Sequence, residues 1–268
     1  METPAAKSER QIADVDLALC RATLYSALAL GFRPPTEETM ARLISPEGAV
    51  ALAEAADLLE TNCHSGLGSA VRRPSLHEPS LEKLSALHRR LFGHTAQGSV
   101  PVYETEYGTE ALFQQPQALG DLMGFYQAFG LALNGEEHER PDHVSCECEF
   151  LCFLALKEAY ALEKGDPSML EETRKAARLF LRDHLGQFVP AFSRKLIRED
   201  RAGFYGALGE LCLSLVTLEC ARLNVPLGAG NLALRPATDD RVPMACGTDS
   251  ECPLVSAAHR VKGFNEEE

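Results

Sequence analysis

Side chains able to bind charged or polar groups gather in the segment Arg140-Pro141-Asp142-His143 and in Glu147, four residues after the histidine. Pro141 and Asp142 are typical of a helix entry, where a carboxylate can accept hydrogen bonds from first-turn amides. We expect His143 to project from the first turn, able to donate or accept hydrogen bonds. Glu147 then lies on the same helix face. Taken alone, the spacing favours a simpler interpretation, in which the helix is well capped and the histidine–carboxylate contact is purely structural.

A second group lies between residues 91 and 108, where tyrosines and glutamates alternate after a predicted helix end. Its members are Leu91, Phe92, Pro101, Tyr103, Glu104, Glu106 and Tyr107. Aromatic rings and carboxylates together suit a peptide that brings apolar and arginine side chains, through cation–π and charge-assisted contacts. The alternative is a loop that straps a helical bundle with its tyrosines packed inward.

The nine cysteines of the chain could bind metal, form a disulfide or fill a core. An odd number, scattered through a chain of this size, predicts reduced thiols in a cytoplasmic protein. Cys148 and Cys152 are four residues apart, and a metal or iron–sulfur site could join them to Cys246, Cys252 or His259. That spacing is not a standard zinc or cluster spacing, so small apolar side chains on a buried helix are the simpler interpretation. A regulatory disulfide is disfavoured in a reducing cytoplasm.

The elements that must position these residues are helices. Apolar residues recur at helical spacing, as at Leu17, Cys20, Leu24 and Leu28, and no segment shows the alternation typical of strands. We therefore predict an all-α protein, a single helical bundle of about nine helices. The predicted helices are 14–30, a short helix after Thr36, 49–60, 80–92, 116–131, 142–163, 167–184, 188–197 and 204–223. Residues 62–79 are predicted to be a loop, and 93–110 an ordered loop.

Domain organisation follows from the same pattern. Residues 1–13 are predicted as an N-terminal extension, 14–224 as the helical domain, and 225–268 as an irregular Pro/Gly-rich tail. Gly31 is expected to stop the first helix before Pro34 and Pro35. The tail contains Gly228-Ala229-Gly230, which we interpret as a bare turn without a cofactor.

Composition excludes several classes of function. The 268 residues carry 26 Lys+Arg against 39 Asp+Glu, a net charge of −13, which disfavours nucleic acid and anionic membranes and suits a cationic partner. The longest apolar stretch, 211–221, is short of the about 20 residues that cross a bilayer, and no secretion signal is apparent. Phosphate loops, Gly-x-Ser-x-Gly, His-Glu-x-x-His and Cys-x-x-Cys motifs are missing, so we expect neither an enzyme nor a cofactor.

Taken in order, several spaced motifs resemble the TorD/DmsD family of cytoplasmic redox-enzyme maturation chaperones. They are Leu91-Phe92, Pro101 with Tyr103-Glu104, Phe125-Tyr126, Pro141-Asp142-His143 with Glu147, Glu149 and Phe150, Phe180 to Leu185, and Phe204-Tyr205. The resemblance covers residues 14–224. The segment Tyr103 to Gly108 is most similar to chaperones of periplasmic dimethyl sulfoxide reductase-type enzymes, such as selenate or chlorate reductases and dimethylsulfide or ethylbenzene dehydrogenases. Cys148 departs from the family pattern, which usually has an apolar residue there.

The resemblance implies a non-enzymatic protein, monomer or homodimer, that binds the apo catalytic subunit of a molybdopterin oxidoreductase. It would hold the subunit's twin-arginine signal until the cofactor is inserted, before export. The residues implied in client and signal binding are Asp142, His143, Leu91, Phe92, Pro101, Tyr103, Glu104, Tyr107, Glu147 and Tyr25. Two alternatives remain: a chaperone of a nitrate reductase-type client that is not exported, and a metal-binding enzyme or sensor built on the cysteines and histidines.

Overall fold

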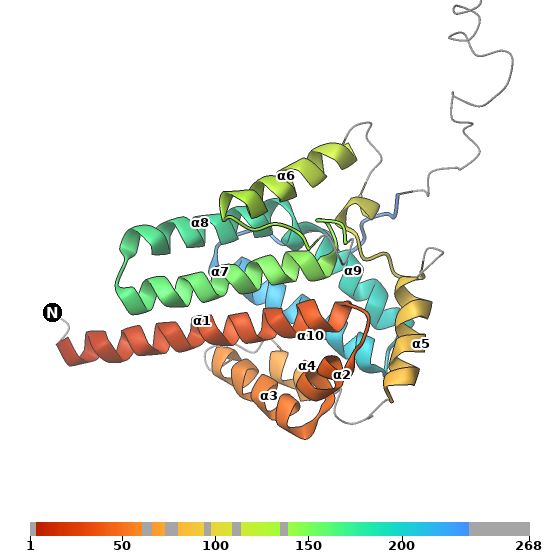
Figure 1. The fold of residues 1–268 in the computed structure, drawn as a ribbon, viewed down its shortest axis with the longest axis horizontal. Coiled ribbons are helices and arrows are strands. Elements are labelled where there is room, and N and C mark those ends of the chain that lie inside the picture. The colour runs from red at the N-terminus through yellow and green to blue at the C-terminus, as the bar shows by residue number, and fades with distance from the viewer. Residues whose placement is uncertain are drawn as a thin grey trace, which may run out of the picture. The chain divides into compact units, whose positions relative to one another are not determined.

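The computed structural model describes residues 4–60, 66–72, 80–93, 98–108, 114–134 and 139–235, and in these ranges it contains ten α-helices and no strand (Figure 1). The predicted all-α class is confirmed. The helices are α1 (Pro4–Phe32), α2 (Glu37–Thr39), α3 (Pro46–Glu60), α4 (Leu67–Arg72), α5 (Leu81–Phe92), α6 (Gln114–Ala128), α7 (Val144–Lys164), α8 (Pro167–Asp183), α9 (Leu185–Glu199) and α10 (Phe204–Arg222). A π-helical turn, Met40–Ile44, follows α2, and a 3-10 turn spans Glu104–Glu106.

Local sequence signals explain several helix ends. The Ser80 hydroxyl accepts the Lys83 amide at the start of α5, and the Asp166 carboxylate accepts the Met169 amide at the start of α8. Gly165 adopts the left-handed conformation (φ 64°) that ends α7. These capping residues therefore set the helix ends that the sequence predicted.

The structure differs from the predicted elements at three places. Helix α1 begins at Pro4, within the predicted extension, and Gly31 does not stop it. A Cβ at position 31 would come within 2.8 Å of the Leu208 side chain, so this glycine permits close packing of α1 on α10. Helix α4 lies inside the predicted 62–79 loop, where its few apolar residues are too short a run to show a period.

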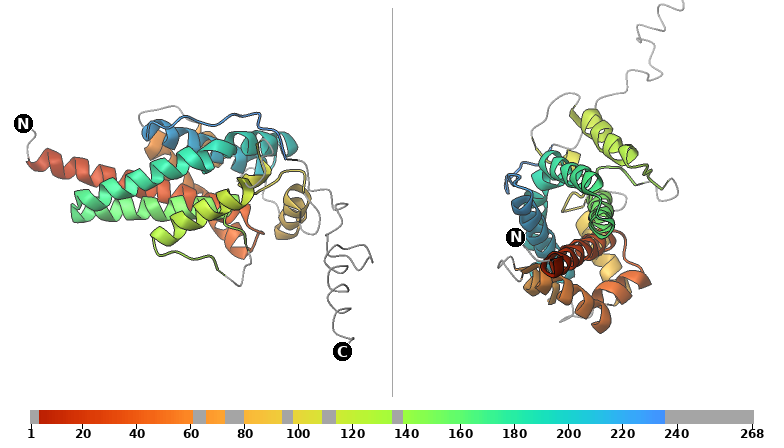
Figure 2. Two further views of the ribbon diagram at one scale, coloured as in Figure 1. Left: turned by 90° about the horizontal axis from the view of Figure 1, so that it is seen from above. Right: turned by 90° about the vertical axis from the view of Figure 1, so that its left-hand side faces the viewer.

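The longest helices form the centre of the bundle. Two ion pairs, Arg33–Glu149 (2.7 Å) and Arg21–Glu158 (3.1 Å), show that α1 and α7 run side by side in opposite directions. Viewed along these helices, α1, α7 and α8 lie next to one another in a ring that α10 closes (Figure 2). Helix α10 is buried on nearly all sides, including Tyr205, Leu211 and Val216.

This burial also explains two apolar segments. Ala13–Phe32 and Phe204–Arg222 are each long and apolar enough to cross a membrane by length and composition, contrary to the expectation that no stretch would be. In the structure 56% of the first and 67% of the second are buried among other helices. Packing in the core accounts for their composition.

A buried ion cluster joins four helices far from residues 98–108. Glu158 of α7 is bound by Arg21 (3.1 Å) and Arg174 (2.7 Å), and Arg222 donates to Glu219 (2.9 Å). Burial opposes ionisation of Glu158, but Arg21, Arg222 and Arg174 outweigh it and lower the pKa of this carboxyl. The cluster therefore ties α1, α7, α8 and α10 together, with three arginines around the two carboxylates of Glu158 and Glu219.

The chain leaving α10 returns across α9. Pro190 lies inside α9 and has no N–H, so the Gly186 carbonyl lacks its helical donor. The Gly228 amide donates to that carbonyl instead, at 2.9 Å. A Cβ at position 228 would lie 2.1 Å from the Gln187 oxygen, so only glycine fits. We call residues 224–234 the return segment; the compact unit runs to Leu234, beyond residue 224.

Candidate functional site

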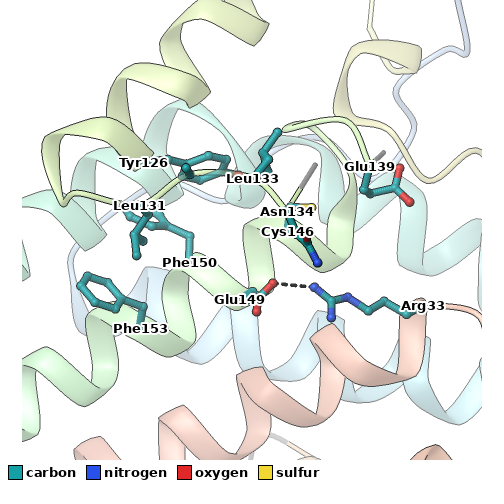
Figure 3. A pocket seen from close by; sticks show the side chains of 11 residues that line it. Arg33, Tyr126, Leu131, Leu133, Asn134, Glu139, Cys146, Glu149, Phe150 and Phe153 are labelled. Atoms are coloured by element: carbon teal, nitrogen blue, oxygen red, sulfur yellow. Dashed lines mark hydrogen bonds and ion pairs between the residues drawn. The ribbon is translucent and has the colours of Figure 1, made fainter. Parts of the chain in front are cut away.

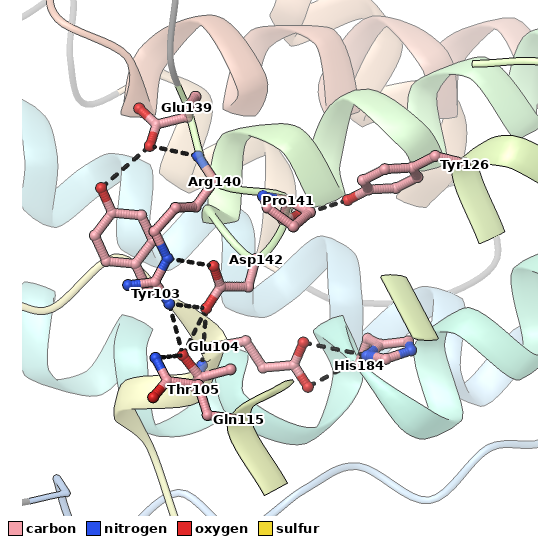
Figure 4. A network of polar contacts seen from close by, with 10 residues as sticks. All are labelled: Tyr103, Glu104, Thr105, Gln115, Tyr126, Glu139, Arg140, Pro141, Asp142 and His184. Atoms are coloured by element: carbon pink, nitrogen blue, oxygen red, sulfur yellow. Dashed lines mark hydrogen bonds and ion pairs between the residues drawn. The ribbon is translucent and has the colours of Figure 1, made fainter. Parts of the chain in front are cut away.

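The segment 98–108 lies across the start of α7 (Figure 4). The Glu104 amide donates to the Asp142 carbonyl (2.9 Å), and the Val144 amide donates to the Val102 carbonyl (2.9 Å). Tyr103 and His143 pair as an isolated antiparallel bridge between these two bonds. The two groups of residues singled out in the sequence are therefore joined through their backbones.

Asp142 is the centre of the polar network in Figure 4. One carboxylate oxygen accepts from the Thr105 amide (3.3 Å), the Thr105 hydroxyl (2.7 Å) and Arg140 Nη2 (2.8 Å); the other accepts from Arg140 Nε (3.0 Å). The carboxylate is fully buried. Asp142 does not cap α7 as expected: its bonds go to residue 105, and His143 is the N-cap. Its contacts are those of a residue that fastens the segment to the helix.

His143 is buried rather than projecting from the first turn. The Ser145 amide donates to its Nδ1 (3.1 Å), so the ring carries its proton on Nε2, 3.9 Å from Glu139. Burial lowers the pKa of His143 to about 3, so the ring is neutral at physiological pH. Its ring centre lies 5.3 Å from that of Tyr103.

Tyr103 is half-buried and held by charged neighbours. Its hydroxyl donates to Glu139 (3.1 Å), and the Arg140 guanidinium lies 4.3 Å from the ring centre. Burial and the Glu139 carboxylate raise the pKa of Tyr103 to about 12. Arg140 thus already occupies the cation–π position that was expected for a client arginine.

Glu104 links the segment to a third part of the chain. Its carboxylate lies 3.2 Å from Nδ1 of His184, the buried residue between α8 and α9. His184 also packs edge-on against Phe125 of α6. The sequence placed Glu104 in the candidate site but gave no sign of this pairing, because periodicity does not reveal contacts between distant segments.

Glu147 is fully buried, and its two oxygens have no hydrogen-bond partner within the described part of the chain. The contact considered between His143 and Glu147 is not formed, since His143 is bonded to Ser145. Burial, with Glu104 and Asp142 nearby, raises the pKa of Glu147 well above its ordinary value. Ionisation of this side chain is therefore opposed inside the bundle.

The remaining predicted binding residues divide by accessibility. Tyr25, Leu91, Pro101 and Tyr107 are buried, and the Tyr107 hydroxyl donates to the Pro101 carbonyl (2.8 Å). Tyr25 lies apart from the segment, near Glu219 and Cys148. Of the ten residues implied in client binding, only Phe92, Tyr103 and Glu104 are partly exposed. The other seven are buried within the described part of the chain.

A cleft of about 360 Å³ opens beside the network, on the outer side of α7 (Figure 3). Its floor is apolar and its rim carries Arg33, Glu139 and Glu149, with Arg33 donating to Glu149 (2.7 Å). The lining residues are Arg33, Tyr126, Leu131, Ala132, Leu133, Asn134, Glu139, Cys146, Glu149, Phe150 and Phe153. Sequence reasoning missed this cleft, because the 131–134 connection and the end of α1 contribute to it from distant parts of the chain.

The cysteines on α7 turn in different directions. Cys148 is fully buried; burial and a hydrogen bond with Cys212 of α10 raise the pKa of its thiol. Cys152 is half-buried, and Cys146 opens on the cleft. No group of three or more histidine, cysteine or acidic residues able to hold a metal occurs among the residues described. Cys246 and Cys252 lie outside them.

Chemically, this arrangement suits binding rather than bond-making. His143 is neutral and caps α7, and the carboxylate of Asp142 already accepts hydrogen bonds from Thr105 and Arg140. What remains accessible is an apolar, partly aromatic cleft with carboxylates at its edge, suited to a peptide with apolar and cationic side chains.

Comparisons with known proteins find a family model and several similar chaperone proteins. A family model described as "nitrate reductase delta subunit" matches residues 46–194. The chain is 43% identical over 95 residues to the selenate reductase assembly chaperone protein of Thauera selenatis, covering 35% of this chain and 48% of that protein. It is 28% identical over 209 residues to the perchlorate reductase assembly chaperone protein of Dechloromonas aromatica, covering 76% of this chain and 89% of that one. It is 27% identical over 200 residues to chaperone protein TorD of Vibrio cholerae, covering 73% and 88%. The match spans about half the length of the selenate and chlorate reductase relatives.

Proposed function

Because the chain belongs to the nitrate reductase delta subunit family, we propose that it is a maturation chaperone for the catalytic subunit of a molybdopterin-containing oxidoreductase. The observation that carries this proposal is the likeness to reductase assembly chaperones over 76% of the chain. The protein acts by binding alone, in the cytoplasm, as a monomer or homodimer.

The chaperone holds the apo catalytic subunit by its twin-arginine signal until the molybdenum cofactor is inserted. Two properties support this step. The chain has a net charge of −13, which attracts a cationic segment, and the cleft beside α7 combines an apolar floor with the carboxylates of Glu139 and Glu149. Arginine pairs readily with carboxylates, and the apolar part of a signal suits the cleft floor.

The experiment deletes the gene of this chain and keeps the gene of the molybdopterin reductase that is encoded nearest to it. We expect the catalytic subunit to accumulate without molybdenum and without activity, and the full-length chain supplied in trans to restore both. Calorimetry with a synthetic signal peptide of that subunit, and with a version carrying Lys-Lys for Arg-Arg, measures signal binding directly. A reductase that is fully loaded with molybdenum in the deletion strain contradicts the chaperone role.

The family's description names nitrate reductase, which supports a second candidate client, a nitrate reductase-type subunit. We propose as the alternative that this client is not exported. In that case the chaperone binds the N-terminus of a client that has no arginine pair. Tight binding of such a peptide, together with weak binding of any Arg-Arg peptide, would select this alternative over the first.

A further inference from the structure

Two large apolar side chains of α7 face away from the bundle. Leu156 is 49% exposed and Tyr160 is 51% exposed. They are four residues apart and therefore lie on one face of the helix. Because Arg21 pairs with Glu158 and the two helices are antiparallel, Leu19 of α1, 42% exposed, lies level with Tyr160. We call Leu156 and Tyr160 the α7 seam.

The edge of the α7 seam that faces α6 is basic. Lys157 and Lys164 are seven residues apart, about two turns of helix, and so share one edge. The Lys157 ammonium lies 5.8 Å from the ring centre of Phe129, the residue after α6. The Lys164 ammonium lies 5.5 Å from the ring centre of Tyr160. Two positive charges therefore flank the α7 seam on the same side.

The edge of the α7 seam that faces α1 is acidic. Glu149 and Glu163 are fourteen residues apart, so they lie on the same side of α7, and Glu149 binds Arg33 of α1 (2.7 Å). Glu163 is exposed, and so is Asp16 of α1, which the antiparallel register places level with Glu163. The Glu149–Arg33 pair is neutral as a whole. Glu163 and Asp16 therefore give this edge two negative charges.

We propose that the α7 seam is the docking site for a second copy of this chain, in a two-fold symmetric contact in which the two α7 helices run parallel. A two-fold axis along α7 places seam on seam and the basic edge of each copy on the acidic edge of the other. Lys164 of each copy then faces Glu163 and Asp16 of the other. An axis across α7 would instead place each edge on itself and bring Lys157 onto Lys164.

The balance of charge favours a second copy over a strongly charged partner. The four edge charges sum to zero, so an acidic or basic segment would gain on one edge what it loses on the other. A second copy presents the same pattern in reverse. The net charge of −13 opposes association at long range, but salt screens it beyond about 8 Å at physiological ionic strength. No client takes part, so the inference is independent of the proposed function.

Sedimentation equilibrium of the full-length protein tests the contact. Because the seam is small, we expect a monomer–dimer equilibrium with a dissociation constant in the micromolar range. Leu156→Gln with Tyr160→Gln should raise this constant at least about tenfold. Val50→Gln with Leu58→Gln makes matched changes on α3, where the side chains are 57% and 44% exposed, and should leave it within about twofold. A wild-type chain that stays monomeric up to millimolar concentration, or equal effects of the two double variants, overturns the proposal.

Cysteine cross-linking tests the parallel arrangement. Each seam residue meets its own copy across the axis, so Leu156→Cys and Tyr160→Cys should each give a disulfide-linked dimer under mild oxidation. The wild-type chain and Val50→Cys, treated in the same way, give the background. An antiparallel contact would link at most one of the two seam positions. That outcome, or no link above background, contradicts the arrangement.

Charge reversal tests the pairing of the edges. Lys164→Glu should weaken dimerisation several-fold, because it places like charges on facing edges. Adding Asp16→Lys and Glu163→Lys to that variant should restore the wild-type constant, since the facing edges again carry opposite charges. Circular dichroism checks that every variant is folded. A triple variant that dimerises no better than Lys164→Glu contradicts the assigned pairing.

Discussion

Replacing Asp142 with alanine tests whether this residue fastens residues 98–108 to α7. The change removes an acceptor for the Thr105 amide and hydroxyl and for two Arg140 nitrogens, at 2.7 to 3.3 Å. Each hydrogen bond to a charged acceptor contributes about 1.5–3 kcal/mol, but the four are not additive. Arg140 is 38% exposed and water can replace its bonds, so only the Thr105 bonds count in full.

The free energy of unfolding is therefore expected to fall by about 3 kcal/mol in Asp142→Ala, near the lower end for loss of one partner of a buried pair. Asp142→Asn keeps the shape and one acceptor, and should cost about 1 kcal/mol. Urea denaturation followed by circular dichroism measures both, with the m value checked for constancy.

Asp183→Ala is the matched control. Asp183 is also paired with an arginine, Arg182, but both side chains are about half exposed (42% and 53%), so the loss should stay below about 0.5 kcal/mol. If Asp142→Ala costs no more than this control, the network does not fasten the segment. If Asp142→Ala instead abolishes signal-peptide binding while the protein stays folded and equally stable, Asp142 is a contact residue and the assignment made from the structure is wrong.

Two further changes probe buried features. Glu147→Gln should raise the free energy of unfolding at pH 8 more than at pH 4. Folding raises the pKa of the Glu147 carboxyl, so this group destabilises the native state once the pH exceeds its unfolded pKa of about 4.3. Equal gains in the thermal unfolding temperature at both pH values would refute this. Gly228→Ala should cost about 2 kcal/mol in urea denaturation, because its Cβ would meet the Gln187 oxygen and pull the donor from Gly186. Gly120→Ala in α6 has nothing within 4 Å and should instead be neutral or slightly stabilising; similar losses in both would remove the argument.

Much of the fold could be predicted because helices are local. Caps such as Ser80 and the stop at Gly165 depend on residues a few positions apart, and the sequence displays them. The role of Gly31 was wrongly predicted because the contact that requires a glycine there is with Leu208 of α10, far away in sequence. The return segment was missed for the same cause, since its hydrogen bonds go to Gly186 and Gly108, whereas α4 was missed because its apolar run is too short to show a period.

The candidate site shows the same limit. Residue types and a family resemblance brought residues 101–107 together with Asp142 and His143, and the structure joins them. Neither could show that Asp142 and Glu147 would be buried, since accessibility depends on everything packed above a side chain. The cleft was hidden because α1, α7 and the 131–134 connection each give it only a few residues.

The return segment also sets an order on how the chain can finish folding. The Gly186 carbonyl, which Pro190 leaves without a helical donor, is bound only by the amide of residue 228. Likewise, Tyr107 pairs with Leu234, and the Gly108 amide donates to Ala233. On a ribosome these late residues emerge long after their partners, and closing so large a loop is slow. The segment 98–108 can therefore form its hydrogen bond at Gly108 only when synthesis has passed residue 234. A newly made chain would be complete as a helical bundle before that segment is fixed at both ends.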